Sequence, residues 1–158
     1  MIALLILLSS ASSAPVCLDR LRDSGQHVSK FDFENDIHGD ASYSCTYSIT
    51  PSQAQMDLNA LLSAADEGDY NKLSCFLSFP FGFVEKNGKY VEISRQSFTK
   101  FAPKIADSIK SKRKFISISN LGFGGWRGLF ADDGKVVLNT TLRPNGQRHL
   151  VLVSIDAR

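Results

Sequence analysis

The spacing of apolar and polar residues along the chain predicts helices first and a sheet afterwards. Apolar residues recur at helical spacing at Leu58, Leu61, Leu62 and Ala65. Thr50 before Pro51 is typical of a helix start, and Gln53 completes a capping box. Gly68 ends this helix, and Asp69 caps a short second one.

A hairpin is predicted next, because the apolar spacing changes to two after residue 79. The Asn87-Gly88 pair is typical of a two-residue type I′ turn, in which both residues adopt positive φ. Pairing outward from such a turn places Val84 opposite Val91.

Helical spacing returns between residues 94 and 110 and is followed by a predicted antiparallel meander. Pro103 cannot donate a hydrogen bond inside a helix, so two short helices are expected, the second beginning at Pro103. The strand candidates and turns are 115–119, 121–130, Asp133-Gly134, 136–142, Asn145-Gly146 and 149–155. Helices followed by a curved antiparallel sheet predict an α+β fold.

The first fourteen residues are typical of a signal peptide, because the apolar run Met1–Leu8 is followed by small residues up to Ala14. Cleavage after Ala11 or Ser13 is an alternative, and lipid attachment at Cys17 is a less favoured one. The run is far shorter than the ~20 apolar residues that span a bilayer, so no membrane span is expected. A periplasmic or secreted protein follows.

The rest of the chain divides into a polar extension over 15–50 and a main domain over 51–158. Alternating residues at 31–33 and 43–47 predict a short β-ribbon in the extension. Apolar residues make up 43% of the chain, which suffices for a core. The net charge of +2 is too small to predict nucleic-acid binding.

Three cysteines in an exported chain predict one disulfide and one free thiol. Cys75 lies in an apolar stretch, where a free thiol behaves as a small hydrophobe, and it is expected to be the unpaired cysteine. Cys17 and Cys45 flank the polar extension, which has little apolar material of its own. A disulfide between them would restrain that segment.

No catalytic or metal-binding pattern stands out, and no cofactor is expected. Glu85 and Glu92 would lie on one face of the hairpin, roughly 7–8 Å apart, but a solvated face is the favoured interpretation. The acidic residues over 32–40 lack the glycine and final glutamate of a calcium loop. The histidines at positions 27, 38 and 149 lack metal-ligand spacing. Anion binding by the basic run 110–114 is an alternative to a solvated helix end.

Residues 57–156 resemble the NTF2-like (cystatin-like α+β cone) superfamily, in particular its small bacterial periplasmic members. The motifs that carry the resemblance are Ala64-Ala65-Asp66-Glu67-Gly68-Asp69, Phe79-Pro80-Phe81, Ser97-Phe98-Thr99-Lys100-Phe101, Trp126-Arg127-Gly128-Leu129-Phe130 and Asp133-Gly134-Lys135-Val136. The resemblance implies helices packed on a strongly bent sheet around a cone-shaped apolar pocket. The candidate pocket residues, for which core packing is the alternative, are Phe81, Phe101, Phe123 and Trp126.

The family resemblance does not imply a reaction, because this fold hosts unrelated activities. The leading hypothesis is a non-catalytic exported protein that binds a small apolar ligand or another exported protein. An inhibitor or immunity protein, which blocks an exported enzyme or toxin, is the alternative. A protruding charged loop at 32–40 or 110–114 would favour it. An isomerase- or dehydratase-like enzyme using the cone pocket is a further alternative, and a homodimer is possible for this family.

Overall fold

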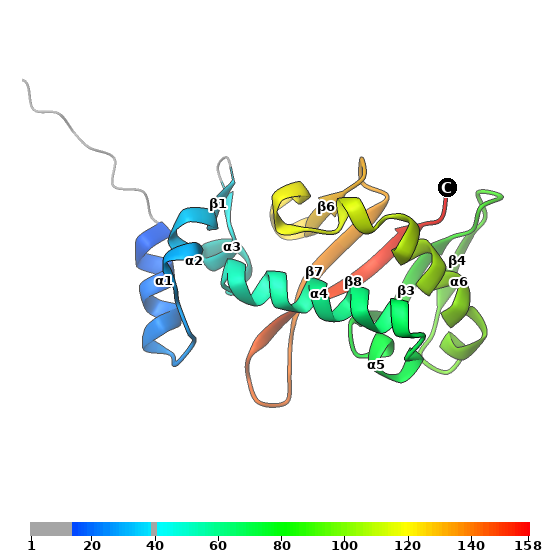
Figure 1. Cartoon of the computed structure of the whole chain (residues 1–158), viewed down its shortest axis with the longest axis horizontal. Coiled ribbons are helices and arrows are strands. Elements are labelled where there is room, and N and C mark those ends of the chain that lie inside the picture. The colour runs from blue at the N-terminus through cyan, green and yellow to red at the C-terminus, as the bar shows by residue number, and fades with distance from the viewer. Residues whose placement is uncertain (1–13, 39–40) are drawn as a thin grey trace, which may run out of the picture.

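The structure is a computed structural model that describes residues 14–38 and 41–158, so the predicted signal peptide lies outside it apart from Ala14 (Figure 1). Six α-helices are described: α1 (Ala14–Asp23), α2 (Lys30–Asn35), α3 (Tyr43–Tyr47), α4 (Pro51–Glu67), α5 (Tyr70–Ser74) and α6 (Phe98–Ser111). The described strands are β1 (Ile37–His38), β2 (Ala41–Ser42), β3 (Leu77–Val84), β4 (Tyr90–Ile93), β5 (Gly122–Phe123), β6 (Leu129–Ala131), β7 (Val136–Leu142) and β8 (Arg148–Asp156). Short 3-10 turns are η1 (Arg113–Phe115), η2 (Ile118–Asn120) and η3 (Gly125–Arg127). None of the helices in these ranges is long and apolar enough to cross a membrane.

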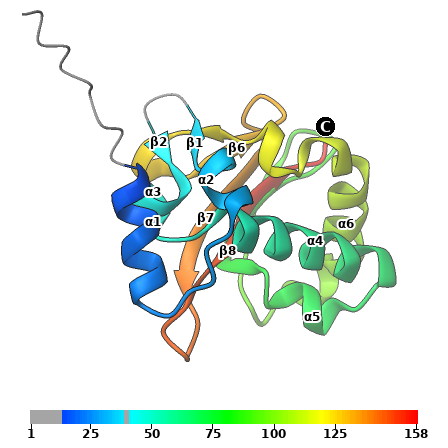
Figure 2. The ribbon, with the colours of Figure 1, turned by 60° about the vertical axis from the view of Figure 1, so that its left-hand side comes forward.

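The fold is α+β, with a curved, unclosed six-stranded sheet in the order β4-β3-β8-β7-β6-β5. The predicted antiparallel meander is present from β5 to β8. Pairing between β3 and β8 is parallel and was not predicted. Helices α4 and α6 pack against the sheet, and the segment before α4 lies at one end of the molecule (Figures 1 and 2). We call that segment, residues 14–50, the N-terminal module.

The core lies between the sheet and helices α4 and α6. Its fully buried side chains include Leu58, Leu61, Phe81, Phe83, Ile93, Ile105, Ile109, Leu138 and Leu152. Each contributes roughly 1.5–3 kcal/mol by leaving water. The helical stripes predicted from the sequence are therefore the faces that pack on the sheet.

Helix α4 begins and ends as predicted. The Thr50 side chain accepts a hydrogen bond from the backbone N–H of Gln53, and Pro51 occupies the first turn. The second half of the capping box is absent, because the Gln53 amide donates instead to Asp57. Gly68 ends the helix at a φ of 66°, and Asp69 caps α5.

The prediction of two helices around Pro103 is wrong, because α6 runs unbroken through it. A proline inside a helix costs about 3 kcal/mol. A continuous helix buries Phe98, Ala102, Ile105 and Ile109 on one face, and these side chains together outweigh that cost. Tertiary packing therefore decides against the break.

The hairpin is present, but its predicted register is off by one residue. Tyr90, not Val91, lies opposite Val84. The Gly88 N–H donates to the Glu85 carbonyl, and Gly88 alone adopts positive φ. These features define a type I turn with a glycine bulge rather than a type I′ turn. A one-residue shift exchanges the two faces of a strand.

The predicted ribbon at 31–33 and 43–47 is also wrong, because both segments are helical and the observed ribbon is β1–β2. Ser42 caps α3 by accepting from the Cys45 N–H. Ser29 and Asp32 form a capping box at α2. Local N-cap hydrogen bonds therefore favour helices in both segments, although the short alternation of apolar and polar residues predicted strands.

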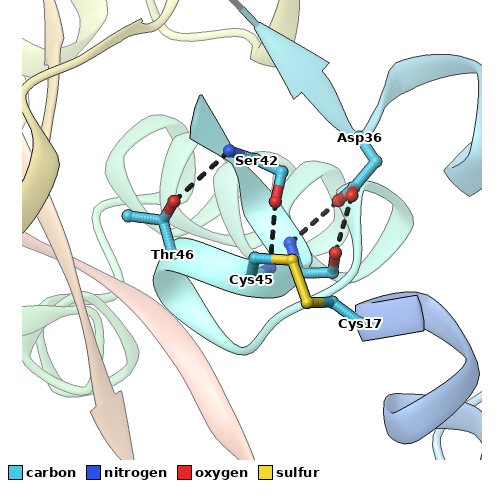
Figure 3. Close-up of a disulfide and its surroundings, with 6 residues drawn as sticks. Cys17, Asp36, Ser42, Cys45 and Thr46 are labelled. Carbon is cyan, nitrogen blue, oxygen red and sulfur yellow. Dashed lines mark hydrogen bonds between the residues drawn. A yellow bond between two sulfur atoms is a disulfide. The ribbon is translucent and has the colours of Figure 1, made fainter. Parts of the chain in front are cut away.

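The predicted disulfide is present between Cys17 and Cys45 and joins α1 to α3 (Figure 3). Cys75 is free, as predicted, and it is exposed although it lies in an apolar stretch of the sequence. Cys75 follows α5, whose buried residue is Leu73. Phe76 and Leu77, the next two residues, are buried in the core, whereas Cys75 is not.

The segment from 115 to 130 contains less strand than predicted. Within 115–119, Phe115 ends η1 and Ile118 begins η2, with two residues between them in neither turn. The segment 121–130 contains β5, η3 and β6. Three glycines at positions 124, 125 and 128 cause the division.

Candidate functional site

The four aromatic residues predicted to line a pocket lie in different surroundings. Phe81 is fully buried in the core, and Phe101 is half-buried against it. Phe123 is half-buried beside the N-terminal module, and Trp126 is 88% exposed. None of the four lines either of the two hollows described below.

Trp126 lies at the tip of the turn that joins β5 to β6, residues 124–128, which we call the Trp126 turn. The Gly124 N–H donates to the Gly128 carbonyl at 2.8 Å and closes the base of the turn. A Cβ at Gly124 would overlap the ring of Phe130. At Gly128, where φ is 113°, a Cβ would overlap the carbonyl oxygen of Leu138. The backbone is therefore held in one conformation that other residues would not fit.

The N-terminal module holds this turn through Tyr47. The Tyr47 hydroxyl lies 2.8 Å from the carbonyl oxygens of both Gly125 and Gly128, and its single proton is shared between them. Burial raises the pKa of this hydroxyl, so it remains a donor at neutral pH. The site therefore depends on residues about 80 positions apart in the sequence.

The segment leading into the turn is held by the same helix, α3. Phe123 packs edge-on against Tyr43, with ring centroids 4.9 Å apart, and against Tyr47 at 5.7 Å. The Tyr43 hydroxyl donates to the Ile118 carbonyl at 3.2 Å. Cys45 lies between the two tyrosines, so the disulfide ties their helix to α1.

The basic run 110–114 does not form an open anion site. Lys110 pairs with Asp107, and the buried Lys112 pairs with Asp132 at 2.6 Å. Arg113 pairs with Asp66. By contrast, Arg127 beside the exposed tryptophan is exposed and forms no ion pair within the described ranges.

Two acidic residues of the 32–40 segment are buried acceptors. Asp32 accepts from Ser29 and from the Ser52 N–H, and these hydrogen bonds outweigh burial and lower its pKa. Asp36 accepts two hydrogen bonds from Ser44, while burial raises its pKa. Asp40 lies outside the described residues. The described residues contain no cluster of side chains suited to a metal ion.

A buried acid and histidine, which the sequence reasoning missed as a pair, lie where α4 meets β8. Asp57 accepts from the Leu150 N–H at 2.8 Å, from Gln53 and from Arg143. Burial raises the pKa of Asp57 and lowers that of His149, whose Nδ1 has no hydrogen-bond partner among the described residues. Neither side chain lines a described hollow. Their arrangement joins helix α4 to β8, an interior strand of the sheet, rather than lining a described hollow.

The two glutamates of the hairpin do not form a catalytic pair. Glu85 reaches α6, where Lys104 donates to it at 2.9 Å. Glu92 lies opposite Gly82, on the other face. The register shift therefore separates the two carboxylates.

Hollows open on the surface of the described part of the chain, and two of them bear on function. One of about 450 Å³ lies between α6 and the β3–β4 turn, with Phe83, Lys104, Asp107, Ser108 and Ala157 among its lining residues. The other, of about 400 Å³, is lined by Phe115, Asn120, Phe130, Ala131, Asp132, Asp133 and Gly134. We call the second one the Phe130 hollow.

Comparison with protein-family models, with curated proteins and with solved structures gave no match for this chain. A function must therefore rest on the site itself. The Trp126 turn is the strongest candidate for a functional site, because a turn closely packed at Gly124 and Gly128 exposes the chain's single tryptophan to solvent.

Proposed function

We propose that this chain is an exported, non-catalytic binding protein that contacts a partner protein through the Trp126 turn. The observation that carries the proposal is the 88% exposure of Trp126 on a backbone held by Tyr47 and by closely packed glycines. Tryptophan is among the residues most often found at the energetic centre of protein interfaces.

Exposed apolar side chains are common, so exposure alone is a weak argument. The conformation of the turn supplies the stronger one. A preorganised loop loses little entropy on binding. Four other exposed apolar residues lie in the adjoining N-terminal module: Val16, Phe31, Phe33 and Ile37.

A partner protein is favoured over a small apolar ligand. The four predicted pocket residues do not line the described hollows, and both hollows carry charged side chains at their rims. An enzyme of the isomerase or dehydratase type is disfavoured because the buried Asp57 and His149 face no described hollow. The disulfide supports export, because such bonds persist in oxidising compartments.

Inhibition of an exported enzyme or toxin is the second candidate function. A projecting, rigid aromatic tip is a shape that can enter a cleft, and that observation favours it. The tip lies at 124–128 rather than at 32–40 or 110–114, where the sequence suggested a loop. The NTF2-like relationship is also a proposal, supported by the order of helices, hairpin, long helix and meander.

A photocross-linking experiment tests the proposed function. Trp126 is replaced by p-benzoylphenylalanine in the full chain, and Leu142, which is 60% exposed on β7, receives the same replacement as a control. We expect position 126, and not 142, to capture a specific protein from an extract of the source cells. The purified protein should then bind the Trp126→Ala variant roughly 30-fold more weakly than the unmodified chain. Equal capture at positions 126 and 142 would overturn the proposal. So would equal binding of the captured protein to the Trp126→Ala variant and to the unmodified chain.

A further inference from the structure

We propose that the partner of the Trp126 turn is a second copy of this chain, with each Trp126 entering the Phe130 hollow of the other. This inference rests on the proposed function and names the partner of that same site. The Trp126 turn precedes strand β6, and the Phe130 hollow is lined by residues of β6 and of the turn that follows it, so the two features adjoin the same short strand.

The Phe130 hollow suits an indole ring. Its volume of about 400 Å³ lies in the range of pockets that hold small aromatic groups. The side chains of Phe115 and Phe130 supply an aromatic lining. A buried indole also needs an acceptor for its N–H. Asp132, Asp133 and Asn120, which also line the hollow, carry carboxylate and amide oxygens that can accept a hydrogen bond from it.

The arrangement permits a closed pair of molecules. Strand β6 spans the three residues between the Trp126 turn and the turn at Asp132, roughly 10 Å of extended chain. Phe130 connects the two features, since it lines the hollow and packs over Gly124. Two copies related by a two-fold axis can therefore place each Trp126 turn at the Phe130 hollow of the other, and the contact then closes on itself.

The charges beside the two features are opposite. Arg127 follows the tryptophan and forms no ion pair within residues 14–38 and 41–158. Asp133, at the rim of the hollow, is exposed and is likewise unpaired there, whereas Asp132 is taken by Lys112. Reciprocal insertion would bring Arg127 of each copy toward Asp133 of the other. This complementarity favours a second copy over an unrelated protein.

The expected dimer is weak. Two buried tryptophans account for roughly 300–500 Å² of interface area. Stable complexes bury about 1,200–2,000 Å². We expect a dissociation constant on the order of tens of micromolar.

Sedimentation velocity of the complete, disulfide-bonded chain tests the inference, from a few micromolar to about 1 mM. The weight-average mass should rise from one chain toward two. The Trp126→Ala substitution should weaken the dimer at least about tenfold, whereas Leu142→Ala should change it by less than about twofold. Both variants are checked for unchanged circular dichroism and thermal midpoint.

Exchanging the two charges distinguishes a specific contact between Arg127 and Asp133 from nonspecific self-association. Arg127→Glu and Asp133→Lys should each weaken the dimer about tenfold. The double variant should dimerise at least about fivefold more strongly than Asp133→Lys alone. Asp133 has a φ of 53°, which strains a lysine at that position. The Asp133→Lys variant and the double variant carry the same strain. The difference in dimer affinity between these two variants therefore reports the effect of Arg127→Glu alone.

A mass of one chain throughout the range would overturn the inference. So would a dimer unaffected by Trp126→Ala, or a double variant no stronger than Asp133→Lys alone. The proposed function stands apart from these outcomes. If the chain is monomeric and position 126 captures a different protein, the inference fails and the proposed function survives.

Discussion

The hydroxyl of Tyr47 lies 2.8 Å from the carbonyl oxygen of Gly128, a residue 81 positions later in the chain. This contact joins the disulfide-bearing module to the turn that exposes Trp126. The module therefore positions the candidate binding site, although it contributes no residue to the tip of the turn.

Replacing Tyr47 with phenylalanine should loosen the Trp126 turn. The change removes the donor shared by two carbonyl groups and should cost about 1–2 kcal/mol of unfolding free energy. The amide protons of Gly124 and Gly128, which close the turn, should exchange with solvent at least about tenfold faster. Tyr43→Phe is the matched control, because its hydroxyl bonds Ile118 outside the turn. Equal exchange rates in the two variants would contradict the role assigned to Tyr47.

Removing the disulfide should destabilise the chain substantially. The bond closes a loop with a sequence separation of 28. The chain-entropy relation gives about 3–4 kcal/mol for such a loop. A Cys17→Ser, Cys45→Ser variant should show this loss in urea unfolding. Cys75→Ser, at an exposed free thiol, should change stability by less than about 0.5 kcal/mol. A small loss in the double variant would show that packing alone holds the module.

Gly128 should tolerate no side chain. Alanine there would overlap the Leu138 carbonyl and would occupy a φ of 113°, so we expect a loss of about 3 kcal/mol or more. Gly146→Ala separates strain from overlap, because Gly146 also has positive φ but open space around it. That control should lose only about 1 kcal/mol. Similar losses at both positions would mean that the turn can move away from Leu138.

Stability should fall on mild acidification because of His149. Burial, aided by the positive charge of Arg143, lowers the pKa of His149 below its ordinary 6.5. The folded chain therefore favours neutral imidazole. This contribution is fully present above pH 6.5 and is lost as the pH falls from there toward the folded-state pKa.

The change in unfolding free energy with pH that is due to His149 can reach about 1.4 kcal/mol per pH unit. Burial raises the pKa of Asp57, so its contribution has the opposite sign: it is present below the ordinary 3.8 and is lost as pH rises through the folded-state pKa. Urea unfolding between pH 7.5 and pH 5.5 should give a smaller slope for His149→Gln than for the unmodified chain. His27→Gln, at an exposed site, is the control. An unchanged slope in His149→Gln would show that this imidazole does not titrate differently on folding.

The features that the sequence predicted correctly are set by short-range contacts. Thr50, Gly68 and Asp69 mark helix ends because caps and positive φ act within a few residues. The pairing of Cys17 with Cys45 followed from the small number of cysteines and their positions. None of these predictions required knowledge of the tertiary contacts between elements.

The turn sequence was also recognised, but its geometry was not. Glu85-Lys86-Asn87-Gly88-Lys89 and Arg143-Pro144-Asn145-Gly146-Gln147 form the same turn, in which the asparagine side chain accepts from the N–H two residues later. Asn-Gly is compatible with more than one loop length. The pairing of the flanking strands, with Phe83 and Phe81 turned into the core, selects the register.

The sequence by itself determined both ends of α4, the start of α5 and the turn positions, because these depend on neighbours along the chain. It also predicted the disulfide, from the number and positions of the cysteines, and the α+β class, from the order of the elements. Only the tertiary structure decided that α6 continues through Pro103, that β3 pairs in parallel with β8, and that Trp126 faces solvent. An aromatic residue looks the same in a sequence whether it is buried or exposed. At Trp126, contacts from Tyr47, Phe130 and Leu138 hold the turn, and each lies on a different part of the fold.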